Sequence, residues 1–99
     1  MGDRNAAQED SGEGMRITKV DSVHGSTQKG AIDFRYLDGK LAGCGYICPN
    51  CGQEDYMPID SVHGWNFSGT EDAPTLLPSI LHRVCNWHGY LTNGEWVQA

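Results

Sequence analysis

Apolar residues recur along the chain with the period of β-strands. Ile32, Phe34 and Tyr36 alternate with charged side chains, and this two-residue period is typical of a half-buried strand. Further short runs are bounded by polar or glycine-containing segments, and we expect strands at residues 15–20, 32–36, 40–47, 56–59, 65–67, 79–84, 89–92 and 95–97. No stretch keeps the 3.6-residue period of a helix. The pattern therefore predicts an all-β fold.

Two dipeptides predict tight hairpins between these strands. Asp38-Gly39 separates two of the apolar runs, and Asn93-Gly94 separates the last two. Asp-Gly and Asn-Gly supply the positive φ angles that a two-residue hairpin turn needs. We therefore expect a small β domain with at least two hairpins.

The length and composition indicate one small domain that gains stability from an added cross-link. The chain has 99 residues, and hydrophobic residues make up 38% of it, so its core is modest. Residues 1–14 are polar and acidic and contain no aromatic or β-branched residue, which is typical of a disordered tail. We expect an acidic tail over residues 1–14 and a zinc-binding β domain over residues 15–99.

The net charge of −6 is unevenly distributed. Residues 41–99 contain six acidic residues against Arg83 alone, which disfavours binding of nucleic acid by that half. Residues 15–40 contain five Lys and Arg against three Asp, together with Phe34 and Tyr36. Weak nucleic-acid binding through residues 15–40 is therefore a minor alternative, and nucleic acid is not the expected partner.

Cysteine and histidine spacing predicts one zinc site. Cys48 and Cys51 are separated by two residues, as are Cys85 and His88, and such pairs let one tight turn present two donors to one ion. Gly52 follows the first pair and can adopt positive φ. We predict zinc held by Cys48, Cys51, Cys85 and His88, with Cys44 as the main rival to His88 and His82 as a second substitute.

A disulfide, a redox motif and a zinc deaminase site fit the cysteines less well than a structural metal does. The chain shows no apolar membrane-spanning run and no secretory signal, so we expect a cytoplasmic protein whose thiols stay reduced or bind metal. Residues 53–58 do not continue as the helix that a redox Cys-x-x-Cys motif needs. The Pro and the upstream Glu of a zinc deaminase are missing as well.

One five-residue segment occurs twice, as Asp-Ser-Val-His-Gly at residues 21–25 and at residues 60–64. The similarity ends at both borders of the segment, so it does not indicate a repeat array. We expect each copy to end a strand with an Asp/Ser turn. A meeting of His24 and His63 in space is the functional alternative.

Four short motifs between residues 44 and 97 resemble the signature of a family of uncharacterised function from phages, prophages and bacteria. They are Trp-x-Phe at residues 65–67, Pro-Thr-Leu-Leu-Pro-Ser-Ile at 74–80, Cys-x-x-His at 85–88 and Gly-x-Trp at 94–96. The resemblance implies zinc binding and a phage or prophage origin. Some relatives have an enzyme-like name, on which we base no expectation. The chain has Cys-x-x-Cys-Gly where the family has Cys-x-Cys-Gly, and Gly89 where the family has an aromatic residue.

These observations favour a zinc-stapled interaction module rather than an enzyme. We expect an accessory protein, phage or prophage in origin, that binds a host or phage protein, with an interaction surface that includes Trp65, Trp87, Tyr90 and Trp96. The alternative role of these aromatic residues is in the core. The main alternative function is a zinc-dependent hydrolase in which the metal keeps an open position for water.

Overall fold

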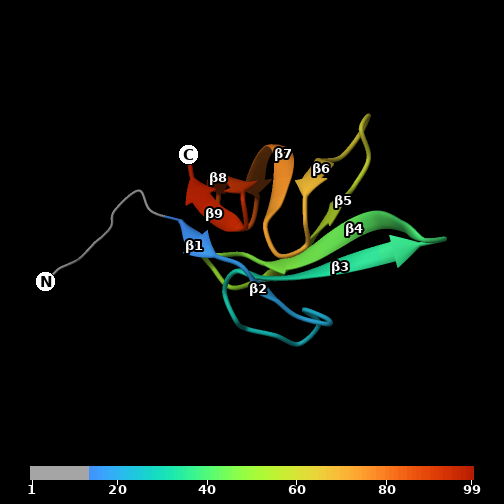
Figure 1. Cartoon of the computed structure of the whole chain (residues 1–99). Coiled ribbons are helices and arrows are strands. Elements are labelled where there is room, and N and C mark those ends of the chain that lie inside the picture. Colours follow the sequence, from blue (N-terminus) through green and yellow to red (C-terminus); the bar gives the residue numbers. More distant parts are fainter. Residues whose placement is uncertain (1–13) are drawn as a thin grey trace, which may run out of the picture.

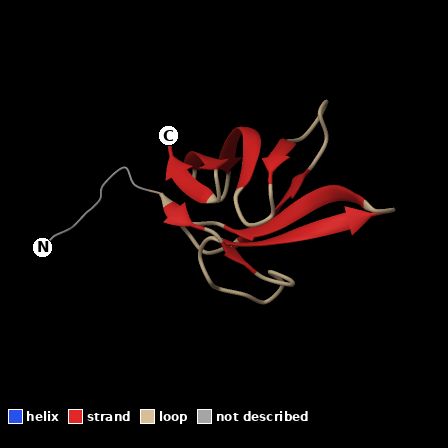
Figure 2. Ribbon diagram, viewed as in Figure 1, coloured by secondary structure: helices blue, strands red, loops and turns tan. Residues whose placement is uncertain are grey.

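The computed structural model describes residues 14–99 as two β-sheets (Figure 1). One sheet has the strand order β1-β9-β8-β7-β6 and the other has the order β2-β3-β4-β5. Figure 2 shows strands and loops only, with no helix in the described residues, so the all-β prediction is confirmed. The strands are β1 (Met15–Arg16), β2 (Thr18–Lys19), β3 (Ala31–Leu37), β4 (Lys40–Ile47), β5 (Glu54–Pro58), β6 (Asn66–Gly69), β7 (Pro74–His82), β8 (Trp87–Thr92) and β9 (Glu95–Gln98).

The tail predicted for residues 1–14 lies outside the described residues, except for Gly14. Residues 14–99 contain no helix that would be long and apolar enough to cross a membrane.

Both predicted hairpins form as expected. Asp38 and Gly39 have φ angles of 53° and 79°, and Asn93 and Gly94 have φ angles of 50° and 77°. Positive φ at both central residues is the geometry of a type I′ turn, whose twist matches that of the flanking strands. The strands pair directly beside each turn, Leu37 with Lys40 and Thr92 with Glu95. The turn residues therefore set the register of both hairpins.

The segment predicted as one strand over residues 15–20 is divided between the two sheets. β1 pairs antiparallel with β9, whereas β2 pairs parallel with β3. Around this crossing, the Ile17 N–H donates to the Gly94 carbonyl at 2.9 Å and the Val20 N–H donates to the Ile32 carbonyl at 2.9 Å. The segment changes partner because the two sheets lie against each other, and a periodic pattern within one segment does not contain that information.

The larger of two apolar clusters lies between the sheets. Tyr46 from β4 packs against Trp96 from β9 with ring centroids 5.4 Å apart, and the Trp96 Nε1–H donates to the Gly30 carbonyl at 2.9 Å. Both sheets contribute buried side chains to this core: Ile32, Cys44, Tyr46, Cys48, Met57, Leu76, Ile80, Trp87, Leu91 and Trp96. Burial of this apolar surface is the main force that holds the sheets together.

Asp33 is a buried carboxylate whose two oxygens both accept hydrogen bonds. It accepts hydrogen bonds from the Val23 and Gly45 N–H groups at 2.9 and 3.0 Å and from Arg35 Nε at 2.8 Å. Burial by itself would raise the pKa of the Asp33 carboxyl, but the hydrogen bonds from Arg35, Val23 and Gly45 outweigh it and lower the pKa below its usual range. Asp33 therefore ties the loop after β2 to the β3–β4 hairpin.

Strand β7 begins earlier and ends earlier than its predicted range of 79–84. Leu76 pairs with Leu91 and Ile80 pairs with Gly89. Three residues of β7 therefore face one residue of β8, Tyr90, between these pairs. Such a bulge admits a proline that has no N–H for the ladder, here Pro78. Pro74 and Pro78 make the first half of this strand resemble a loop in sequence, which is why the prediction began only at residue 79.

Candidate metal centre and the outer face of the β7–β8 hairpin

The first turn of the candidate metal centre follows β4. The Gly52 N–H donates to the Cys48 carbonyl at 3.0 Å, and the Cys48 N–H donates to the Gln53 carbonyl at 2.8 Å. Gly52 has a φ of 82°, which a residue with a side chain rarely adopts. The Asn50 N–H points at Cys48 Sγ at 3.4 Å. The turn thus aims its two thiols to one side and directs a backbone donor at one of them.

The second turn joins β7 to β8. His82 is the last residue of β7, and its carbonyl accepts hydrogen bonds from the N–H groups of Cys85 at 3.3 Å and Asn86 at 2.7 Å. Asn86 closes the turn with a φ of 63°, a conformation that Asn tolerates better than most residues. The turn therefore brings a histidine and a cysteine, with two residues between them, to the same end of the hairpin.

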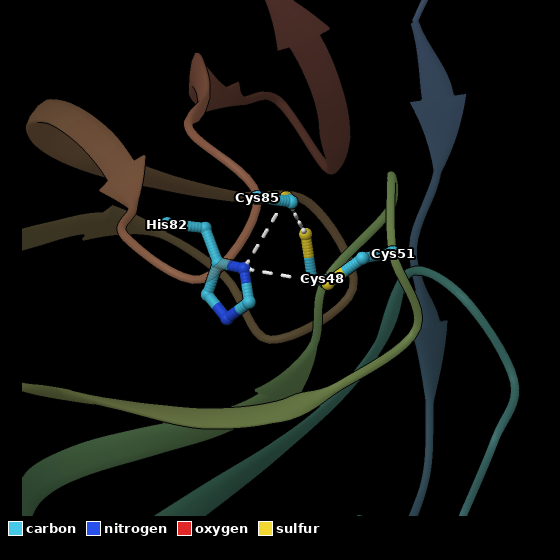
Figure 3. A group of neighbouring side chains, drawn as sticks. All are labelled: Cys48, Cys51, His82 and Cys85. Carbon is cyan, nitrogen blue, oxygen red and sulfur yellow. Dashed lines mark hydrogen bonds between the residues drawn. The ribbon is translucent and has the colours of Figure 1, made fainter.

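The two turns gather three cysteines and one histidine (Figure 3). The donor atoms of Cys48, Cys51, His82 and Cys85 all lie within 4.8 Å of one another. Cys48 Sγ is 3.7 Å from Cys85 Sγ, and His82 Nδ1 is 3.5 Å from the Sγ atoms of both Cys51 and Cys85. The cysteines are free thiols, so no disulfide joins the turns.

The three distances agree with those expected between donors arranged as a tetrahedron around one ion. Metal–sulfur bonds of about 2.3 Å and metal–nitrogen bonds of about 2.0–2.1 Å give S···S edges of about 3.8 Å and N···S edges of about 3.5 Å. The observed separations of 3.7 and 3.5 Å match both values. The cluster is therefore compatible with a metal site that uses all four donors.

The environments of Cys48 and Cys85 shift the pKa values of their thiols in opposite directions. Burial raises the pKa of the Cys48 thiol to about 11, although the N–H groups of Cys51 and Asn50 act in the opposite direction. The pKa of the Cys85 thiol is lowered to about 6, mainly by hydrogen bonds from the Asn50 and His82 side chains. Cys85 is thus the readier thiolate, and thiolates are the form that binds metals.

The structure brings together three of the four predicted ligands and replaces the fourth. His88 lies outside the cluster because it is exposed on β8 and pairs with Leu81, while its neighbour Trp87 pairs with His82. Successive residues of a strand point to opposite faces, so His88 points away from the side on which His82 meets the thiols. The spacing His82-x-x-Cys85 is as visible in the sequence as Cys85-x-x-His88, and only the face distinguishes them.

Cys44, the predicted rival ligand, is also outside the cluster. It is fully buried in β4 and pairs with Phe34 and Met57. Burial raises the pKa of its thiol to about 12. Cys44 therefore behaves as a small core residue.

The outer face of the β7–β8 hairpin presents a serine and a histidine. On β7, Ile80 and His82 are buried, Leu81 between them is exposed, and Ser79 is half-buried. His88 lies directly opposite Leu81, which makes Ser79 and His88 diagonal neighbours. Diagonal neighbours on one face have Cα atoms about 7–8 Å apart, within reach of long side chains. The bulge ends at Ser79, and bulges often re-aim a side chain beside active sites.

The aromatic residues predicted as an interaction surface do not share one surface. Trp87 and Trp96 are buried in the core, and Trp65 is half-buried against it. Tyr90 is 40% exposed on the outer face of β8 beside His88, with ring centroids 6.2 Å apart. The core role is therefore the one that the structure gives to both Trp87 and Trp96.

Several cations of the basic stretch 15–40 are held by partners within the protein. Lys19 Nζ lies 3.5 Å from Glu71 and 3.1 Å from Asp72, and Arg35 is bonded to Asp33. Each of these pairs reduces the charge available to a phosphate backbone. Nucleic-acid binding through this stretch stays a prediction that these contacts disfavour.

The two copies of the repeated pentapeptide have different environments. Val23 in the first copy is fully buried, whereas Val62 in the second is 76% exposed. His24 Nδ1 lies 2.6 Å from Glu54 Oε2, and Val62 N–H donates to Asp60 Oδ1 at 2.8 Å. The copies are therefore not structural equivalents.

The two β-sheets and the cluster of three cysteines and one histidine define this protein as a small all-β domain with a candidate metal centre. Residues 19–99 match the family described as "Bacterial ubiquitination-like system serine protease (BubE)", and the chain belongs to that family. No curated protein and no solved structure showed a significant match. The matched range includes the motifs between residues 44 and 97. The phage or prophage origin stays a prediction.

Proposed function

We propose that this chain is a zinc-stabilised serine peptidase that acts in a bacterial ubiquitination-like system, with Ser79 as nucleophile and His88 as base. The observation that supports it most is that the half-buried Ser79 and the exposed His88 are diagonal neighbours on the β7–β8 hairpin. That placement occurs in a chain whose family is described as a serine protease. A hydroxyl that can act as nucleophile and an imidazole that can act as base are the two groups that serine catalysis needs.

Zinc is the metal that best fits the cluster. Three thiolates and one imidazole are a donor set that zinc prefers in structural sites. Four protein donors leave no position for water, whereas a catalytic zinc keeps one open. We therefore assign the metal to the fold, and the family's protease description to a serine rather than to a metal-dependent hydrolase. The zinc holds the hairpin that positions Ser79 and His88, because His82 and Cys85 lie between them in the chain.

The proposed reaction uses these two side chains in the usual order for a serine peptidase. His88 takes the Ser79 Oγ proton as the oxygen attacks the carbonyl carbon of the peptide bond. The protonated His88 then gives that proton to the leaving amine as the C–N bond breaks, and an acyl-serine remains. Water, deprotonated by His88, hydrolyses the ester and restores Ser79. No other co-reactant is needed.

A second histidine has some of the features of a catalytic base. His24 is oriented by Glu54 at 2.6 Å, which resembles the carboxylate that orients a catalytic histidine. Ser22 Oγ, however, accepts the backbone N–H of His24 at 3.2 Å, and both residues lie on an exposed loop. Sites on strands are held more rigidly than sites on loops, so we place His24 second.

The test is covalent labelling of the zinc-loaded full chain by a fluorophosphonate, with the adduct located by mass spectrometry. We expect one adduct on Ser79 and none in Ser79→Ala. His88→Gln should slow labelling at least about 100-fold, because a general base contributes that much or more. Ser68→Ala, which removes an exposed serine from β6 of the same sheet, is the matched control and should label like the wild type.

Three outcomes would contradict the assignment. An adduct at Ser22 that is lost in His24→Gln would move the site to the loop. Peptide cleavage that survives Ser79→Ala would favour the metal-dependent alternative. A zinc-loaded wild type that forms no adduct and cleaves no peptide would contradict the peptidase proposal and favour the interaction role.

A further inference from the structure

The centre leaves one polar atom of His82 to be explained. The His82 ring is fully buried, and its Nδ1 faces the sulfurs of Cys51 and Cys85. Nδ1 must be unprotonated to bind a metal, so the neutral ring has its proton on Nε2. Nε2 is itself buried and has no hydrogen-bond partner of good geometry. A buried N–H without an acceptor destabilises the site, so an acceptor is expected beside it.

Asp55 is a carboxylate in the right place. Its Oδ2 lies 3.3 Å from His82 Nε2. Its Oδ1 accepts the N–H of Tyr56 at 2.8 Å, which fixes the orientation of the carboxyl group and leaves Oδ2 directed at the ring. Asp55 is on β5, opposite Tyr46 in the ladder, and the Tyr46 ring meets the His82 ring edge-on with centroids 6.1 Å apart. Two residues of the four-stranded sheet therefore hold the ring of a ligand that belongs to the other sheet.

We propose that Asp55 positions His82 for metal binding by accepting the Nε2–H hydrogen bond. The inference rests on the proposed metal centre and extends it beyond its four ligands. A carboxylate that accepts the second N–H of a ligating histidine selects the tautomer, fixes the ring plane and makes the other nitrogen a better donor. Asp55 thereby couples the two sheets through the metal.

The test measures zinc affinity by chelator competition on the full chain at fixed pH and ionic strength. Asp55→Ala should weaken zinc binding about 10–100-fold, which is the usual effect of losing such a partner. Asp55→Asn should recover part of that loss, because its amide oxygen can accept the same hydrogen bond. Glu54→Gln is the matched control. It removes the same charge from the adjacent residue, whose carboxylate faces His24 instead, and it should change affinity less than twofold.

A second readout separates positioning from simple charge attraction. The zinc-loaded wild type should show a slowly exchanging Nε2–H proton of His82 by NMR, and Asp55→Ala should lose it. If Asp55→Asn and Glu54→Gln weakened zinc binding equally, the positioning role would be contradicted. The effect would then be attraction between a negative charge and the metal. Asp55→Ala with wild-type affinity, or a His82 that ligates through Nε2, would overturn the inference. A wild type that binds no zinc would instead contradict the metal centre itself.

Discussion

His82 and His88 lie on opposite faces of one β-hairpin, and the comparison shows how a strand face assigns chemistry. His82 is fully buried and meets three thiols, whereas His88 is exposed beside Tyr90. His82 pairs with Trp87 and His88 pairs with Leu81, so the two histidines belong to adjacent pairs of one ladder. A shift of register by one residue would turn the side chains of the shifted strand to the opposite face.

The two faces also differ in what water can reach. A structural metal is best shielded, because competing water and protons weaken its thiolate bonds. A nucleophile must instead be open to a substrate. Under the proposed function the hairpin would meet both needs at once, since its inner face carries His82 of the candidate metal centre and its outer face carries Ser79 and His88. Changes on the inner face should therefore alter stability, and changes on the outer face should alter activity alone.

The largest effect is expected from the three thiols of the candidate metal centre. Cys48→Ser, Cys51→Ser or Cys85→Ser should abolish zinc binding and unfold the domain. Structural zinc contributes about 10–16 kcal/mol of apparent binding free energy, whereas a small domain is stable by only about 5–15 kcal/mol. Metal analysis and NMR dispersion measure both effects. Cys44→Ser is the control and should keep one zinc per chain. If Cys44→Ser lost zinc and Cys85→Ser kept it, Cys44 would be a ligand and Cys85 would not.

Replacing each histidine in turn tests whether His82, and not His88, binds the metal. His82→Ala should weaken zinc binding by more than about 100-fold, because it removes a ligand and opens a buried space. His88→Ala should leave zinc affinity within about twofold of the wild type, because His88 lies outside the cluster. Chelator competition at constant pH measures both constants. The opposite result would return the site to the ligand set that the sequence predicted.

Replacing Asp33 tests whether a buried charge in the four-stranded sheet contributes to the stability of the fold. Asp33→Asn should lower the free energy of unfolding by about 2 kcal/mol at neutral pH, since it weakens hydrogen bonds to a charged acceptor. The pKa of Asp33 is depressed in the folded protein. The stability it contributes is therefore present above its unfolded pKa of about 3.9 and is lost as the pH falls through the folded value. Denaturant unfolding of the zinc-loaded wild type and Asp33→Asn at neutral pH measures the difference, because the thiolates that bind zinc become protonated in the acid range where the contribution of Asp33 is lost. Equal stability of the two proteins at neutral pH would contradict this account.

The smallest effect on stability is expected on the outer face. Ser79→Ala and His88→Gln should change the free energy of unfolding by no more than about 0.5 kcal/mol, as is usual for surface substitutions. Thermal unfolding of the zinc-loaded variants provides the measurement. A destabilisation of several kcal/mol in either variant would show that these side chains support the fold, and the contrast between the faces would disappear.

Local chemistry was enough to determine a large part of this protein. The turns at Asp38-Gly39 and Asn93-Gly94 form where they were predicted, because positive φ at two successive residues is a property of those residues alone. The two-residue alternation of Ile32, Phe34 and Tyr36 indicated a strand for the same reason. The first metal-binding turn at Cys48–Gly52 was also predictable, since its spacing and its glycine act within five residues.

Only the tertiary structure decided which histidine joins the thiols and which side chains are accessible. His82 and His88 are both at a spacing of two residues from Cys85, and the choice depends on which face of β7–β8 is covered by the other sheet. The same covering buries Trp87 and Trp96, while the bulge at residues 77–79 rebuilds a strand from a proline-rich segment. These features depend on contacts between segments far apart in the chain, and a local pattern does not specify how two sheets pack.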